Sequence, residues 1–151
     1  SVELHVVGEG ENLNVLKVLT EKYNLKDRVI FHGILSGRSL SNLLLNCQIG
    51  VGTLAMHRKG LYEDCSLKTA EYLWHGLPVI MSAADKRFKG IPYVFHQPPN
   101  DSAIDIDSII DSYSKFKNDN IPLDEMQNIV VARASWKTAW ANLIDDIKNY
   151  E

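Results

Sequence analysis

Cysteine is scarce in this sequence, and its two cysteines, Cys47 and Cys65, do not form a C-x-x-C pair. A disulfide framework is therefore not expected, and the sequence predicts a reducing compartment. The five histidines lack metal-ligand spacing with one another or with the cysteines, so we expect neither a metal nor a cofactor. A G-x-S-x-G motif is also missing, which leaves no candidate for a hydrolytic serine nucleophile.

Long apolar runs are missing as well. No run approaches the ~18 residues that a membrane-spanning helix needs, and no signal peptide is recognisable. These absences predict a cytoplasmic protein. The net charge of −3 gives no basic footprint for nucleic acid. The chain opens on a strand pattern at Ser1 without an initiator methionine, and we expect it to be a fragment of a longer protein.

What is present is an alternation of strand and helix patterns over 151 residues, a length that suits one domain. Apolar spacing and turn residues predict the elements. The expected strands are Val2–Val7, Arg28–His32, Ile49–Leu54, Val79–Met81 and Ile91–Phe95. The expected helices are 11–24, 36–46 with Leu40, Leu43, Leu44 and Leu45 inward, 67–75, 102–116, 122–134 and 136–150. This order predicts an α/β fold, a Rossmann-like three-layer sandwich with a parallel sheet.

The chain is organised around residues 60–82, G-L-Y-E-D-C-S-L-K-T-A-E-Y-L-W-H-G-L-P-V-I-M-S. Ser66 can cap a helix by accepting a backbone N–H bond from its first turn. Gly76 and Pro78 form the usual stop sequence after that helix. The apolar run that follows suits a strand covered on both faces.

Two carboxylates bracket this unit. Glu63 precedes the helix, where free N–H groups and the helix dipole favour an anion such as a phosphate. Helical geometry at 100° per residue predicts a buried face formed by Leu67, Ala70, Leu73 and Trp74, with Glu71 at its border. Arrangement alone leaves two interpretations open: a binding site, or a Glu71–Lys68 surface pair beside a solvated Glu63. The basic loop at His57–Lys59 likewise has two interpretations: it contacts a diphosphate, or it is simply a solvated loop.

The spacing of Glu63 and Glu71, with seven residues between them, resembles the E-x7-E signature of retaining, nucleotide-sugar-dependent glycosyltransferases. The residues S-L-K-T-A-E-Y-L-W-H-G-L-P-V-I complete that pattern. The segments V-E-L-H-V-V-G-E-G and D-R-V-I-F-H-G precede it in the same order. The chain therefore resembles the C-terminal, donor-binding half of a GT-B fold glycosyltransferase of the group 1, or GT4-like, family.

The resemblance implies roles for particular residues. Glu63 would be the catalytic-site acid that bonds hydroxyls of the transferred sugar, and Glu71 would bond the ribose hydroxyls. The donor diphosphate would meet the backbone amides of Asp64, Cys65, Ser66 and Leu67. The nucleobase would lie against the backbone of Gly33, Ile34 and Leu35. Asp64 departs from the small residue usual in the family, and its carboxylate is compatible with a diphosphate if it points away.

The resemblance also implies a function for the longer protein. Residues 1–151 would form a single nucleotide-sugar-binding domain, with the acceptor domain and the cationic phosphate clamp upstream of Ser1. The enzyme would transfer a hexose, with retention and without a metal, to a glycan or lipid, in a setting such as polysaccharide assembly at the inner membrane face. The isolated domain would be inactive, and its last helix would pack on the missing domain. The alternatives are a non-catalytic Rossmann-like module that binds a partner and a two-domain nucleotide-sugar epimerase.

Overall fold

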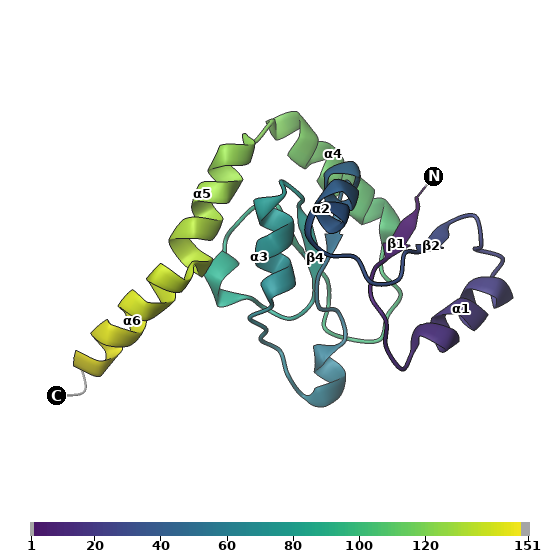
Figure 1. Cartoon of the computed structure of the whole chain (residues 1–151), viewed down its shortest axis with the longest axis horizontal. Coiled ribbons are helices and arrows are strands. Elements are labelled where there is room, and N and C mark those ends of the chain that lie inside the picture. The colour runs from purple at the N-terminus through teal and green to yellow at the C-terminus, as the bar shows by residue number, and fades with distance from the viewer. Residues whose placement is uncertain (1, 149–151) are drawn as a thin grey trace. The chain divides into compact units, whose positions relative to one another are not determined.

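The computed structural model describes residues 2–148, and Figure 1 shows its helices and strands. The chain consists of two compact units. Unit 1 comprises the residues up to Leu43, and unit 2 begins at Leu44. Strand and helix alternate in both units, and every strand pair is parallel. The predicted α/β class with parallel strands is confirmed.

Unit 1 is built on two parallel strands, β1 (Leu4–Val6) and β2 (Val29–Phe31), connected through helix α1 (Leu13–Lys22). Leu4 is aligned with Val29 and Val6 with Phe31. The sequence predicted all three elements, each a few residues longer than observed. The backbone after β2 turns at Gly33, whose φ of 66° is in the left-handed region that favours glycine.

Unit 2 contains a three-stranded parallel sheet in the order β3-β4-β5, and helix α2 (Gly37–Asn46) leads into it from unit 1. Val79 of β4 is aligned with Gly50 of β3 and with Val94 of β5. The remaining elements are β3 (Gly50–Val51), η1 (Met56–Lys59), α3 (Leu67–Trp74), β4 (Val79–Met81), η2 (Lys86–Phe88), β5 (Val94–His96), α4 (Ile106–Asp119), α5 (Leu123–Ala134) and α6 (Trp136–Lys148). The two 3-10 helices, η1 and η2, lie in segments that the sequence analysis treated as loops.

Helix ends in unit 2 follow the predicted capping chemistry. The Ser66 hydroxyl accepts a hydrogen bond from the Lys68 amide at 3.1 Å, which fixes the start of α3. Gly76, with φ of 78°, follows the helix as predicted. The Ser135 hydroxyl likewise accepts from the Thr138 amide at 3.2 Å and starts α6. Local sequence therefore determines where these helices begin and end.

The core of unit 2 lies between β4 and the helices α3 and α5. Its members share nearly complete burial and come from the sheet, α3, α5 and the η2 region. They are Leu73, Val79, Met81, Phe88, Ile91, Tyr93, Val94 and Met126. Because all three residues of β4 are buried, the prediction of a strand covered on both faces is confirmed.

The predicted buried face of α3 is wrong in part. Leu73 is fully buried, but Leu67 is 78% exposed and Trp74 is also exposed. The helix turns Thr69 and Leu73 inward instead, because α5 packs on it and Gln127 of α5 donates to the Trp74 carbonyl at 3.1 Å. Glu71 lies on the opposite side from Thr69 and is exposed, not at the border of the core.

One other burial prediction, on α2, also differs from the structure. Leu44 of α2 is buried, but Leu45, predicted to point inward with it, is 64% exposed. On α6 the apolar face is present, yet Trp136, Trp140 and Ile144 are all exposed. The side chain of Ile147 and residues 149–151 lie outside the described residues. Among the described helices, none is long and apolar enough to cross a membrane.

Candidate functional site

The loop before α3 is attached to the edge of the unit 2 sheet. Glu63 forms an isolated parallel bridge with Ala84, just after β4. The Asp64 amide donates to the Ala84 carbonyl at 2.9 Å, and the Ala84 amide donates to the Tyr62 carbonyl at 2.8 Å. The loop therefore lies at the carboxyl end of β4, where open α/β sheets bind ligands.

Glu63 has a cationic partner that the sequence analysis missed. The Lys86 ammonium lies 2.8 Å from the Glu63 carboxylate, and both side chains are well exposed. Lys86 belongs to η2, in a segment between β4 and β5 for which the sequence predicted neither a helix nor a strand. Nothing in the local sequence spacing indicates this pairing, because it depends on the parallel bridge at Ala84.

The carboxylate of Asp64 accepts a hydrogen bond from the hydroxyl of Thr53, which follows β3. The Asp64 amide is also engaged, by the carbonyl of Ala84. This residue therefore supplies no amide to a diphosphate in this conformation, which corrects the prediction for Asp64.

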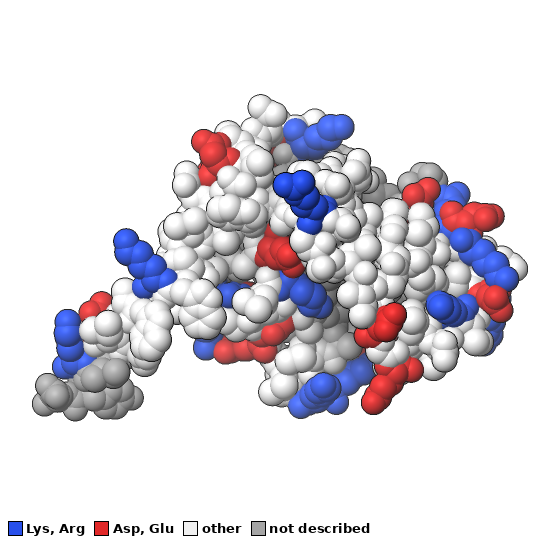
Figure 2. All heavy atoms as spheres, viewed as in Figure 1, with Lys and Arg blue, Asp and Glu red and all other residues white. Residues whose placement is uncertain are grey.

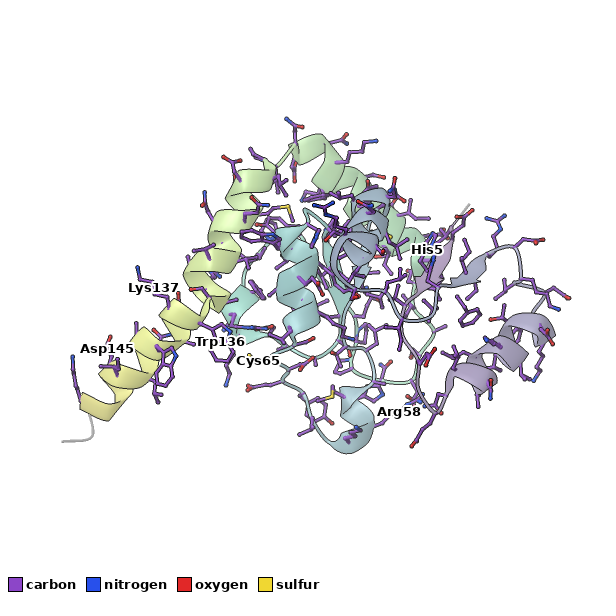
Figure 3. All side chains as sticks on the ribbon, in the orientation of Figure 1. His5, Arg58, Cys65, Trp136, Lys137 and Asp145 are labelled. Carbon is purple, nitrogen blue, oxygen red and sulfur yellow. The ribbon has the colours of Figure 1, made fainter. Side chains whose placement is uncertain are left out.

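The next three amides, those of Cys65, Ser66 and Leu67, have no hydrogen-bond acceptor among the described residues. They stand at the N-terminal end of α3, where unpaired N–H groups and the helix dipole both attract anions. Cys65, labelled in Figure 3, is exposed and free. Three of the four amides predicted for the diphosphate are thus available to a ligand.

Arg87 fixes the backbone at this helix start. Its guanidinium donates to the Ser66 carbonyl at 2.8 Å and to both carboxylate oxygens of Asp85. Asp85 is only 1% exposed at its side chain, and hydrogen bonding with it raises the pKa of Arg87. From α5, Arg133 donates to the carbonyls of Arg87 and Lys89. A buried ion pair thus ties the candidate site to the core of unit 2.

Glu71 lies one turn into α3 with its carboxylate in solvent. It shares the exposed side of the helix with Leu67, four residues earlier. No ion pair joins it to Lys68 among the described residues. The alternative in which Glu71 serves as half of a surface pair with Lys68 therefore finds no support in the observed geometry.

The predicted nucleobase contacts belong to unit 1 and are described there by themselves. The Gly33 carbonyl accepts from the Gly8 amide at 2.7 Å, while the side chain of Ile34 is 70% exposed. The first of these residues therefore joins the two segments just past the carboxyl ends of β1 and β2, and the second offers an apolar surface. How these residues relate to Glu63–Glu71 stays a prediction.

Two basic residues of the loop at His57–Lys59 are paired with an acidic residue of this chain, Asp101, and the sequence did not predict this pairing. On η1, the ring nitrogen Nε2 of His57 lies 3.0 Å from the Asp101 carboxylate, and Nε of Arg58 donates to that carboxylate at 2.7 Å. Hydrogen bonds, first from Arg58 and then from His57, hold the pKa of Asp101 below its ordinary value of 3.8. These two basic groups therefore face Asp101 and not the start of α3.

Charge on the molecule is mixed in sign. Figure 2 shows acidic and basic side chains interspersed over the face in view. Among the described residues, no three His, Cys, Asp or Glu side chains are grouped so that they could hold a metal ion.

Parallel strands, a loop at the carboxyl end of the sheet and an anion-attracting helix start are typical of open α/β proteins that bind ligands at this edge. Residues 1–94 match the family described as "Glycosyl transferases group 1". The chain belongs to this family, so the predicted family is confirmed.

Known proteins agree with this assignment. The chain is 32% identical over 79 residues to the "Uncharacterized glycosyltransferase YqgM" of Bacillus subtilis (strain 168), covering 52% of this chain and 20% of that protein. The fold is similar to AviGT4, a glycosyltransferase involved in avilamycin A biosynthesis, with TM-score 0.67 and 16% identity over 98% of this chain and 43% of that one. It is also similar to the pneumococcal O-GlcNAc transferase GtfA, with TM-score 0.61 and 12% identity over 96% of this chain and 29% of that one. The chain therefore spans a fifth to under half of these proteins, and the likeness supports the fold expected of half of a GT-B enzyme.

Proposed function

We propose that this chain binds the donor of a retaining glycosyltransferase, which transfers a hexose from a nucleoside diphosphate sugar to an acceptor glycan or lipid. The observation that carries the proposal is the grouping of Glu63, Lys86 and the available amides of Cys65–Leu67 at the carboxyl end of the sheet. A carboxylate accepts hydrogen bonds from neighbouring sugar hydroxyls, and N–H groups bind phosphate oxygens. Both halves of a sugar nucleotide thus have partners in one loop.

Transfer breaks the bond between the anomeric carbon and the diphosphate oxygen and forms a bond from that carbon to an acceptor oxygen. The acceptor hydroxyl loses its proton, and the diphosphate leaves with additional negative charge. The α3 amides and the Lys86 ammonium would stabilise that charge as it develops. No step needs a metal ion, so we propose that transfer is metal-independent and that a chelator leaves the activity unchanged.

Glu71 and residues Gly33–Leu35 complete the proposed donor site. Glu71 is exposed on α3, so its carboxylate is accessible to the two hydroxyls of a ribose. The Gly33–Leu35 backbone would contact the base, with the exposed Ile34 side chain beside it. In the longer protein, we propose that the acceptor site and the remaining phosphate-binding cations come from outside this chain, and that the enzyme works at the cytoplasmic side of a membrane.

Calorimetric titration of the chain with UDP, GDP, ADP and the matching sugar nucleotides tests this proposal. With the preferred donor, Glu63→Gln should remove most of the extra affinity of the sugar nucleotide over the nucleotide, because a neutral amide is a poorer acceptor. Glu71→Gln should weaken both ligands roughly tenfold. Glu125→Gln, an exposed acid on α5, is the matched control and should change neither.

Failure of every nucleotide to bind a folded chain would instead favour the non-catalytic interaction module. The epimerase alternative is separated by product analysis on a longer, active form of the protein. A hexose joined to an acceptor with its anomeric configuration retained would support transfer. A free epimerised sugar would contradict it.

A further inference from the structure

Residues 84–87, which follow β4, are bound along their length to the loop 62–66 that precedes α3. Ala84 forms backbone hydrogen bonds with this loop through both its amide and its carbonyl. Further along the chain, Nη2 of Arg87 donates to the carbonyl of Ser66 at 2.8 Å. Ser66 is the N-cap of α3, so this contact reaches the peptide unit at which the helix begins.

The Ser66 carbonyl and the Leu67 amide belong to one peptide unit. A trans peptide is planar, and its C=O and N–H groups point in opposite directions. The described residues contain no cis peptide bond, so this geometry applies here. The Leu67 amide has no hydrogen-bond acceptor among those residues, and it points away from the side on which Arg87 binds the carbonyl. A donor fixed at the carbonyl thus also fixes the direction of the available N–H group.

Arg87 is itself fixed by the core of unit 2. Asp85, whose side chain is 1% exposed, accepts from the amide and Nε of Arg87 at 3.0 Å each and from Nη2 at 2.6 Å. The guanidinium also lies over the ring of the buried Phe88, 5.2 Å from its centroid. From α5, Arg133 donates to the Arg87 carbonyl at 3.2 Å. The position of the guanidinium is therefore set by the fold and does not depend on a ligand.

The charge of Arg87 is balanced by Asp85, so its effect on a ligand passes through the peptide unit. A charged donor at a carbonyl polarises the amide, and hydrogen bonds in such a chain strengthen one another. We infer that Arg87 is a positioning residue of the donor site, which orients the Leu67 N–H group toward the diphosphate and strengthens it as a donor. This inference rests on the proposed function, in which the α3 amides bind the donor diphosphate.

Titration with the best-binding nucleoside diphosphate, and with the same nucleoside lacking phosphate, tests this role. Arg87→Gln should lower the ratio of the two affinities roughly tenfold, because it removes a charged hydrogen bond from the Ser66 carbonyl. Lys89→Gln removes a nearby exposed charge and is the matched control, which should leave the ratio unchanged. Arg87→Lys keeps a charge beside the buried Asp85, so it protects against unfolding. Its single nitrogen does not replace both Nε and Nη2, and the ratio should still fall severalfold.

Two further measurements separate positioning from a purely structural role. In the ligand-free chain, Arg87→Gln should shift the NMR signals of the Ser66 carbonyl carbon and the Leu67 amide proton, whereas Lys89→Gln should shift neither. Met126→Ala truncates a core side chain that is 1% exposed, so it should destabilise the chain. At a temperature where this variant is folded, its affinity ratio should equal that of the parent chain.

The outcomes distinguish this inference from the proposed function. A parent chain that binds no nucleoside diphosphate would refute the proposed function and the inference with it. Binding by the parent with an unchanged ratio in Arg87→Gln would overturn the inference alone. An equal fall of the ratio in Met126→Ala would also overturn it, because the effect would then follow stability. A fall confined to the Arg87 variants, together with shifted Ser66 and Leu67 signals, supports it.

Discussion

Units 1 and 2 carry similar apolar patterns but bury them to very different extents. In unit 2, Leu73, Val79 and Met81 are completely buried between the sheet and two helices. In unit 1, helix α1 leaves Leu16, Val18 and Leu19 exposed, although the apolar spacing predicted a helical stripe that contains them. A stripe predicts which residues share a face, but burial requires another element to pack on that face.

The residues proposed for donor binding come from units that differ in this packing. The groups for sugar and diphosphate, Glu63 and the α3 amides, are attached to the well-packed unit through Ala84 and Arg87. The backbone proposed for the base follows β2 in the sparsely packed unit. We therefore expect the diphosphate end of the site to be the more rigid part.

The largest effect is expected at the buried ion pair of unit 2. Asp85→Ala should lower the free energy of unfolding by about 3–5 kcal/mol, because it leaves the Arg87 charge without its partner. Thermal and urea unfolding measure this loss. Asp111→Ala, on the exposed side of α4, is the control and should lie within about 0.5 kcal/mol of the parent chain. Equal stability of the two variants would show that the ion pair of Asp85 with Arg87 does not stabilise unit 2.

The next prediction contrasts the packing of the two units. Leu73→Ala should cost about 2–5 kcal/mol, since it creates a cavity in the core. Val18→Ala, at a side chain that is 62% exposed, should cost less than about 1 kcal/mol. Urea unfolding of each variant, compared with the parent chain, measures the two costs. A cost for Val18→Ala comparable to that for Leu73→Ala would show that the α1 stripe is buried in solution.

A smaller effect is expected from the exposed contact at Glu63. Lys86→Gln should weaken nucleoside diphosphate binding about two- to fivefold, the range of an exposed charge pair. Raising the salt concentration should shrink the difference, because ions screen exposed charges. Calorimetric titration at two salt concentrations measures both effects. Identical affinities for parent and variant at low salt would exclude Lys86 from the diphosphate contact.

The smallest effect concerns pH. The pKa of Asp101 is lowered in the folded chain, chiefly by Arg58, so its contribution to stability is present above the ordinary value of 3.8. That contribution should be lost as the pH falls through the lowered pKa. Carbon-detected NMR titration of the carboxylate should show the shift, and Arg58→Gln should return the pKa toward its ordinary value. An unchanged pKa in that variant would contradict the contact.

Features of the fold that depend on neighbouring residues in the sequence were predicted correctly. Ser66 and Gly76 begin and end α3 as predicted, and the apolar run at Val79–Met81 forms the buried strand β4. The rotation of α3 was not predictable from its own residues, because α5, far along the chain, decides which face is buried.

The candidate site shows the same limit. The spacing of Glu63 and Glu71 predicted the candidate site, but its contacts with Lys86 and Arg87 depend on the pairing of Ala84 with Glu63. The engagement of the Asp64 amide depends on that same pairing. The basic loop was similarly ambiguous, since its partner Asp101 comes from the segment after β5. Contacts between distant segments are what local patterns leave undetermined.

The central claim is that the start of α3 binds the diphosphate of a sugar nucleotide. The most direct measurement follows the amide NMR signals of Cys65, Ser66 and Leu67 while UDP, GDP and ADP are added in turn. The account predicts that one nucleotide shifts these three signals together with those of Gly33–Leu35, which would also identify the base. Saturating nucleotide that leaves all three α3 amides unchanged in a folded chain would contradict it.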